Sequence, residues 1–108
     1  MKCKVIFLQA ALDDIEQIVA YIAQDNVNAA LRLHDRIIET ASKLSDFPMS
    51  GRLVPDEKIG NHGFRMIGLG NYIIFYKVYD NDSKVVVLRV LHGARDYPSL
   101  LIPDEDTE

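Results

Sequence analysis

A chain of 108 residues, 48% of them apolar, has room for one domain with one hydrophobic core. Its apolar runs are too short to cross a bilayer, and its N-terminus lacks the features of a secretory signal, so we expect a cytoplasmic protein without a membrane segment. The single Cys3 excludes an internal disulfide and a cysteine metal cluster, and we expect no metal and no organic cofactor.

Charge is distributed unevenly along the chain. The net charge is −4, but Asp104, Glu105, Asp106 and Glu108 account for all of it. We expect residues 1–103 to form the domain and residues 104–108 to be a disordered acidic tail. Residues 47–103 hold seven cations against five anions, which weakly favours an anionic partner.

The N-terminal half predicts a strand followed by two helices. Residues 2–8 have the composition of a strand, and apolar residues then recur at helical spacing from Leu12 to Ile22. Adjacent residues on a helix point about 100° apart, so Asp13 and Asp14 do not converge. We interpret both as solvent-exposed carboxylates that complement the helix dipole, in preference to an acid–base or metal pair.

A second helix is predicted after a break at residues 25–28, where two residues can serve as N-caps. Its apolar stripe runs from Ala30 to Leu44. The short connection predicts an antiparallel helical hairpin that packs on a sheet. His34 borders this stripe and is interpreted as structural or exposed.

Residues 46–63 are predicted to form a long loop. Arg52, Lys58 and His62 give the loop three groups that could meet a phosphate, with Arg52 and Lys58 the main candidates. Nothing in the spacing forces them to converge, and solvated loop charges are the alternative.

Three runs of β-branched and aromatic residues follow, at 64–67, 72–79 and 85–91, separated by short turn-forming segments. Such short connections exclude parallel crossovers, so we expect a three-stranded antiparallel meander. The fold class is therefore α+β, a two-layer domain with an N-terminal strand, a helical hairpin and a meander.

Alternation along the predicted strands sorts their side chains onto two faces. One face is almost wholly apolar and suits a helical cover. The other combines cations with large apolar groups and is predicted to be an exposed partner-binding surface. Its predicted members are Arg65, Ile67, Ile73, Phe75, Lys77, Val87, Arg89 and Leu91. The alternative is that residues 99–102 fold back over this face.

Local sequence motifs accompany these predicted elements. The chain reads A-x-x-D-I-x-x-I-x-x-Y-I at 11–22, Pro48 with Gly51 and Arg52, NYIIFY at 71–76 and VLRVLHGARDY at 87–97. Together they resemble the RelE/ParE superfamily of toxins from bacterial type II toxin–antitoxin systems, and LHGARDYP with NYIIFY looks more like ParE.

The resemblance implies one of two activities. ParE-like members act on DNA gyrase, whereas RelE-like members cleave mRNA on the ribosome, and both are neutralised by an antitoxin that wraps the toxin. We expect a ParE-like gyrase inhibitor that functions in growth arrest and plasmid stabilization, with RelE-like endonuclease activity as the alternative. A harmless binding module, or a homodimer that uses the same surface, is a third possibility beside a toxin–antitoxin hetero-oligomer.

The nuclease alternative can be tested on the residues. RNA cleavage by the 2′-hydroxyl needs a base, a cationic clamp on the phosphate and an acid for the leaving oxygen. Arg65 and Arg89 are predicted to share a face and to clamp, and similarity to RelE adds His92 as base or acid and Tyr97 near the C-terminus. The alternation of side chains along this strand also permits a second interpretation, in which His92 is buried and hydrogen-bonded to the backbone.

Overall fold

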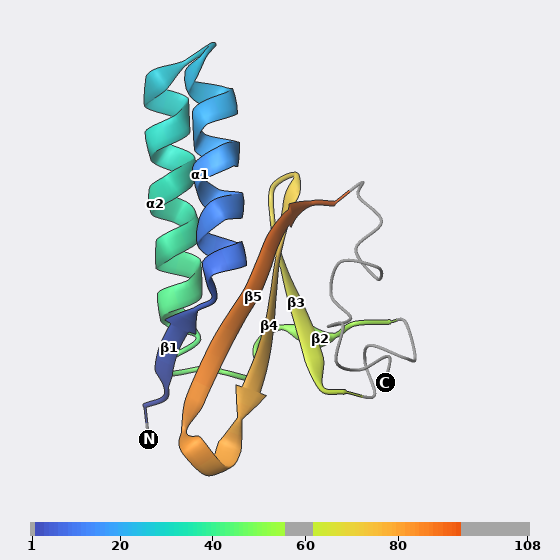
Figure 1. Ribbon diagram of the computed structural model, residues 1–108. Helices are drawn as coiled ribbons and strands as arrows, with labels where there is room; N and C mark the ends of the chain where they lie inside the picture. The colour runs from blue at the N-terminus through green and yellow to red at the C-terminus, as the bar shows by residue number, and fades with distance from the viewer. Residues whose placement is uncertain (1, 56–61, 94–108) are drawn as a thin grey trace.

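The computed structural model describes residues 2–55 and 62–93, which form a helical hairpin beside one mixed sheet (Figure 1). Helix α1 spans Gln9–Ala23 and α2 spans Val27–Lys43. The predicted α+β class is confirmed, as are the N-terminal strand, the hairpin and the antiparallel meander. Neither helix is long and apolar enough to cross a membrane.

The sheet has the strand order β1-β5-β4-β3-β2. Its strands in the described ranges are β1 (Lys4–Phe7), β2 (Arg52–Leu53), β3 (Phe64–Leu69), β4 (Tyr72–Tyr79) and β5 (Lys84–His92). β3, β4 and β5 form the meander, and β1 pairs parallel with β5. β2 lies inside the segment predicted to be loop throughout, so that prediction was wrong for Arg52 and Leu53.

The turns follow the sequence signals. Gly70 takes a φ of 62° between Leu69 and Tyr72, a left-handed conformation that glycine adopts without steric cost. Asn26 caps α2, because its side-chain oxygen accepts a hydrogen bond of 2.9 Å from the amide of Ala29. The N-cap predicted within residues 25–28 is thus Asn26, directly before the first residue of the helix.

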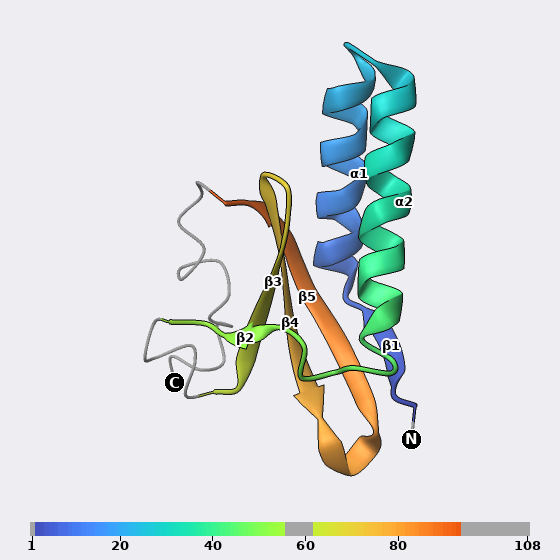
Figure 2. The ribbon, with the colours of Figure 1, turned by 180° about the vertical axis from the view of Figure 1, so that it is seen from behind.

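Two apolar clusters hold the domain together, one on each face of the sheet. On the helix side, Ile15 and Ile37 pack with Ile74, Tyr76 and other strand residues. On the second face a smaller cluster contains Val54, Phe64, Met66, Phe75 and Leu91. Figures 1 and 2 show α1 between α2 and β5 from both sides, so the hairpin covers the β1–β5 end of the sheet.

A β-bulge changes the predicted assignment of side chains to faces. Phe75 pairs with Arg89 but Tyr76 pairs with Val87, so Leu88 is an extra residue in β5. Residues directly opposite each other on neighbouring strands share a face. Val87 therefore faces the helices with Tyr76, while Leu91 lies on the second face opposite Ile73.

The side chains of the first strand of the meander, β3, were also assigned to the wrong faces of the sheet. Arg65 pairs with Tyr76 and Ile67 pairs with Ile74, both of which belong to the helix side. Of the eight predicted partner-binding residues, five belong to the second face by their strand pairing: Ile73, Phe75, Lys77, Arg89 and Leu91. The prediction that Arg65, Ile67 and Val87 lie on the second face was therefore wrong, because all three are on the helix side.

The centre of the second face is buried, whereas Ile73 and Lys77 of the predicted surface are half-buried. Phe75 has no exposed surface and Leu91 only 2%, and Val54 from the segment after β2 packs into the same cluster. The predicted cover at 99–102 and the acidic tail at 104–108 lie outside the described residues.

Candidate functional site: a cleft between α1 and β5

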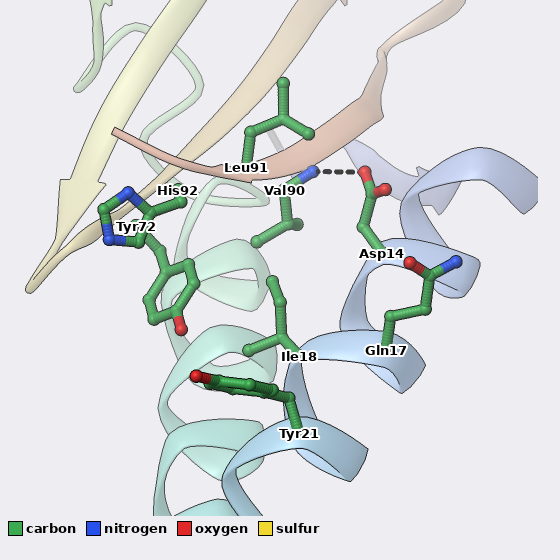
Figure 3. Close-up of a pocket in the computed structure, with 8 residues that line it drawn as sticks. All are labelled: Asp14, Gln17, Ile18, Tyr21, Tyr72, Val90, Leu91 and His92. Carbon is green, nitrogen blue, oxygen red and sulfur yellow. Dashed lines mark hydrogen bonds between the residues drawn. The ribbon is translucent and has the colours of Figure 1, made fainter. Parts of the chain in front are cut away.

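A cleft opens where α1 passes the end of β5, with a volume of about 250 Å³. Helix α1, the start of β4 and the end of β5 supply its walls (Figure 3). Its lining residues are Asp14, Gln17, Ile18, Tyr21, Tyr72, Val90, Leu91 and His92. We call it the α1–β5 cleft.

The helical wall follows from the period of α1. Asp14, Ile18 and Tyr21 are spaced by four and three residues, which places them on one flank of the helix. Figure 3 shows the Tyr21 ring lying next to Ile18 at the mouth of the cleft. Tyr21 is 74% exposed, so a large aromatic surface is available there.

The sheet wall is built by the pairing of β4 with β5. Tyr72 lies opposite His92, and their rings form an edge-to-face contact with centroids 5.5 Å apart. His92 is exposed, so the buried-histidine interpretation was wrong. The ring is positioned at the cleft, beside Tyr72.

Asp14 joins the helix to the strand. Its carboxylate accepts hydrogen bonds from Arg89 Nε at 2.7 Å and Arg89 Nη2 at 2.8 Å, and from the backbone amide of Val90 at 2.9 Å. β1 ends opposite Val87, so beyond that point Asp14 accepts the hydrogen bond that a neighbouring strand would accept. One side chain thereby continues the pairing of the sheet edge.

The Arg89 guanidinium remains charged in this environment. Its hydrogen bonds to Asp14 raise the pKa of Arg89, partial burial opposes this, and the negative charge of Asp14 adds to the increase. Bidentate geometry of this kind fixes orientation as well as charge. Arg89 is therefore a fixed structural group with its donors directed at the helix.

The exposed interpretation of Asp14 was wrong, because this carboxylate is only 8% exposed. Asp13 is exposed, as predicted, and accepts a hydrogen bond from Gln9. Two sequence signals pointed to the pair: Asp14 lies three residues from Ala11 and four from Ile18 on the apolar flank, and Arg89 interrupts a strand of aliphatic residues. A buried charge of each sign calls for a partner.

Arg65 is bound elsewhere. Its Nη1 donates to the carbonyl oxygen of Gly51 at 2.7 Å. The Tyr76 hydroxyl accepts from the amide of Gly51 and donates to the carbonyl of Pro48, both at 2.8 Å. The two arginines predicted to clamp one phosphate thus have different partners, and the Pro48–Gly51 turn is held against the sheet.

The remaining predicted residues do not gather at the cleft. Arg52 is exposed on β2, opposite Met66. Lys77 places its Nζ 5.3 Å from the ring centroids of both Phe64 and Tyr79, a cation–π arrangement. His62 lies beside Phe64, with ring centroids 6.2 Å apart. Lys58 and Tyr97 fall outside the described residues.

The chemistry of the α1–β5 cleft is that of a binding site for a side chain or short segment. Ile18 supplies apolar surface, while the tyrosine hydroxyls and the Gln17 amide supply hydrogen-bonding groups. Within the described part of the chain, no group of three His, Cys, Asp or Glu residues could hold a metal ion.

Comparison with known families gives a match over most of the chain. Residues 5–97 match the family described as ParE toxin of type II toxin-antitoxin system, parDE. A protein from Sinorhizobium fredii, called putative toxin Y4kP, is 31% identical over 91 residues, which cover 84% of this chain and 88% of that protein.

Solved structures share the fold. A toxin–antitoxin complex, RelBE2 from Mycobacterium tuberculosis, contains a chain that matches with a TM-score of 0.66 at 24% identity, covering 85% of this chain and 99% of that one. The chromosomal ParDE system from P. aeruginosa matches with a TM-score of 0.67 at 18% identity, covering 84% and 96%.

Proposed function

Because this chain belongs to the ParE family of toxins from type II toxin–antitoxin systems, we propose that it inhibits DNA gyrase and is neutralised by a cognate antitoxin. The observation that carries the proposal is the family match, which runs from β1 to beyond the end of β5. Such a toxin works in the cytoplasm, where gyrase acts on DNA.

The contacts of the arginines favour gyrase inhibition over RNA cleavage. A nuclease of this fold needs cationic groups that can close on a phosphate. Arg89 donates through Nε and Nη2 to Asp14, so a bidentate contact with a phosphate through these two groups would require it to leave Asp14, and Arg65 donates through Nη1 to the carbonyl oxygen of Gly51. Breaking the partly buried Asp14 contact costs free energy that an exposed clamp would not lose.

The first test measures gyrase directly. Purified chain is added to gyrase with relaxed plasmid, and both supercoiling and cleaved DNA are followed. We expect loss of supercoiling with accumulation of broken DNA. Antitoxin added before the chain should prevent both effects. A chain that arrests growth but leaves gyrase unaffected, and that cleaves ribosome-bound mRNA, would overturn the proposal.

A second test separates a toxin from a harmless binding module. Induction of the chain alone should arrest growth, and co-expression of the small protein encoded beside it should relieve the arrest. Unimpaired growth at a confirmed level of folded protein would instead support the module or homodimer alternative.

We propose that the antitoxin contacts the chain at the α1–β5 cleft. The exposed ring of Tyr21 and the neighbouring Tyr72 provide aromatic anchors, which dominate the energetics of many interfaces. Phe75 at the centre of the second face, predicted from sequence to bind this partner, is buried, whereas Tyr21 at the cleft is exposed. The structural relatives include toxin–antitoxin complexes, which supports a protein partner of this kind.

A further inference from the structure

Three lysines surround an exposed tyrosine beside the turn between β4 and β5. Tyr79 is the last residue of β4, and Lys84, the first residue of β5, lies directly opposite it. Lys84 also pairs with Lys4 of β1, and Lys77 lies two residues before Tyr79. We call these four residues the lysine–tyrosine patch. It lies where β5 begins, whereas the α1–β5 cleft lies where β5 ends, and Figures 1 and 2 show this turn away from the tip of the hairpin.

All four side chains of the patch belong to the second face of the sheet. Val78 packs with the cluster on the helix side, so Lys77 and Tyr79, which flank it in β4, point away from the helices. Lys84 lies opposite Tyr79, and Lys4 lies opposite Lys84, so both share this face. The three ammonium groups therefore gather on a surface that the hairpin does not cover.

The tyrosine ring holds two of the ammonium groups in place. The Nζ atoms of Lys77 and Lys84 each lie 5.3 Å from the centroid of the Tyr79 ring. Lys77 Nζ is also 5.3 Å from the centroid of Phe64. Cation–π contacts attract a cation without neutralising its charge. The two ammonium groups are therefore positioned for an anion before it binds, which lowers the entropy lost on binding.

The sheet itself provides no counter-charge for these lysines. The five described strands contain no Asp or Glu residue. The turn after β4 carries Asp80 and Asp82, and its one ion pair among the described residues joins Asp82 to Lys84 at 3.9 Å, with 65% of the Asp82 side chain exposed. Lys4 faces Lys84 directly, and like charges in this position are unfavourable. An anionic partner would relieve this repulsion.

We propose that the lysine–tyrosine patch binds the phosphate backbone of double-stranded DNA. Ammonium groups bind phosphates as compact point charges, and lysines that neutralise a duplex release its counterions. Lys77 and Lys84 are diagonal neighbours on antiparallel strands, about 7–8 Å apart, so they can contact separate phosphates. Tyr79 is the one exposed large apolar residue in β1, β3, β4 and β5, so the patch lacks the apolar core of a typical protein interface.

The place of this contact in the proposed function is the DNA that gyrase holds, but the test needs no gyrase. The full chain is titrated into a fluorescently labelled duplex of about 20 base pairs, and anisotropy is followed at several salt concentrations. Binding should be saturable at about 50 mM salt and should weaken as salt rises. Lys77→Gln with Lys84→Gln should weaken it at least about tenfold and lower the salt slope by about two. Lys77→Arg with Lys84→Arg should preserve both.

Matched variants separate the patch from general charge effects. Arg36→Gln with Lys43→Gln removes the same charge from α2 and should leave binding within about twofold of the parent. Tyr79→Leu should weaken binding about threefold with an unchanged salt slope, because the ammonium groups keep their charge but lose the ring that positions them. Circular dichroism of each variant establishes that a loss of binding is not a loss of folding.

Four outcomes overturn the inference. They are no saturable binding of the duplex at about 50 mM salt, and an equal loss in the α2 control variant. Tighter binding of single-stranded RNA than of the duplex would assign the patch to RNA, and equally strong competition by a glutamate peptide of the same charge would assign it to an acidic protein. A chain that binds the duplex but leaves gyrase unaffected would overturn gyrase inhibition and leave DNA binding established.

Discussion

Asp14 and Arg89 lie 75 residues apart in the chain and form a bidentate ion pair that attaches α1 to β5. The same carboxylate accepts the amide of Val90, so the helix is fixed to both the side chain and the backbone of the strand. Both walls of the α1–β5 cleft contain residues of this contact. The ion pair therefore sets the position of the helix relative to the sheet at the cleft.

Replacing Asp14 with asparagine should lower the free energy of unfolding by about 2–3 kcal/mol, because a partly buried guanidinium loses its counter-charge. Urea denaturation measures the change. Asp13→Asn is the control, since Asp13 is exposed, and should change the free energy by less than about 0.5 kcal/mol. Equal effects of the two substitutions would show that Asp14 stabilises the fold no more than an exposed carboxylate does.

The contribution of Arg89 should not vary with pH in the neutral and mildly alkaline range. Since the pKa of Arg89 is raised in the folded chain, its stabilisation is complete below the ordinary arginine pKa and is lost only when pH rises through the folded value. The difference in unfolding free energy between parent and Arg89→Gln should be the same at about pH 7 and pH 10. A difference that shrinks at the higher pH would contradict this.

Gly51→Ala should destabilise the chain by about 1–3 kcal/mol. A Cβ there would lie 2.6 Å from the Tyr76 hydroxyl oxygen and 2.7 Å from the carbonyl oxygen of Met66, which is backbone and cannot rotate away. Gly68→Ala, at the one exposed position of β3, is the matched control, because no atom lies within 4 Å of its Cβ position. Thermal unfolding of both should show a loss for the first and no loss, or a small gain, for the second.

Tyr21→Ala should weaken the complex with the antitoxin by about 2 kcal/mol, because its ring is 74% exposed at the α1–β5 cleft. Isothermal titration calorimetry with the antitoxin measures the change. Tyr79→Ala removes a similar ring at the far end of β4 and should have little effect on affinity. Unchanged affinity for Tyr21→Ala would exclude the cleft as the antitoxin contact.

The secondary structure could be predicted because local signals were consistent. Helical spacing marked α1 and α2, Asn26 provided an N-cap, and turn formers separated the three strands of the meander. The two-residue strand β2 was missed, because Arg52 and Leu53 form a strand only through pairing with β3, a tertiary contact that local composition does not reveal.

The faces of the sheet could not be predicted from alternation alone. The extra residue Leu88 switches the side of everything after it in β5, so a strict two-residue period misplaced Val87. The candidate site was likewise only partly predictable. His92 was a candidate from the sequence, but the cleft depends on how α1 docks, which follows from the distant contact between Asp14 and Arg89.

The position of β5 makes the other elements of the fold depend on it. It is the strand that β1, β4 and α1 all contact, yet it is the last strand in the described chain to be synthesised. A chain that ends before Lys84 leaves β1 without its neighbour and Asp14 without its counter-charge at the same time. Truncation within the last strand should therefore abolish the toxin altogether and should not yield a weakened form of it.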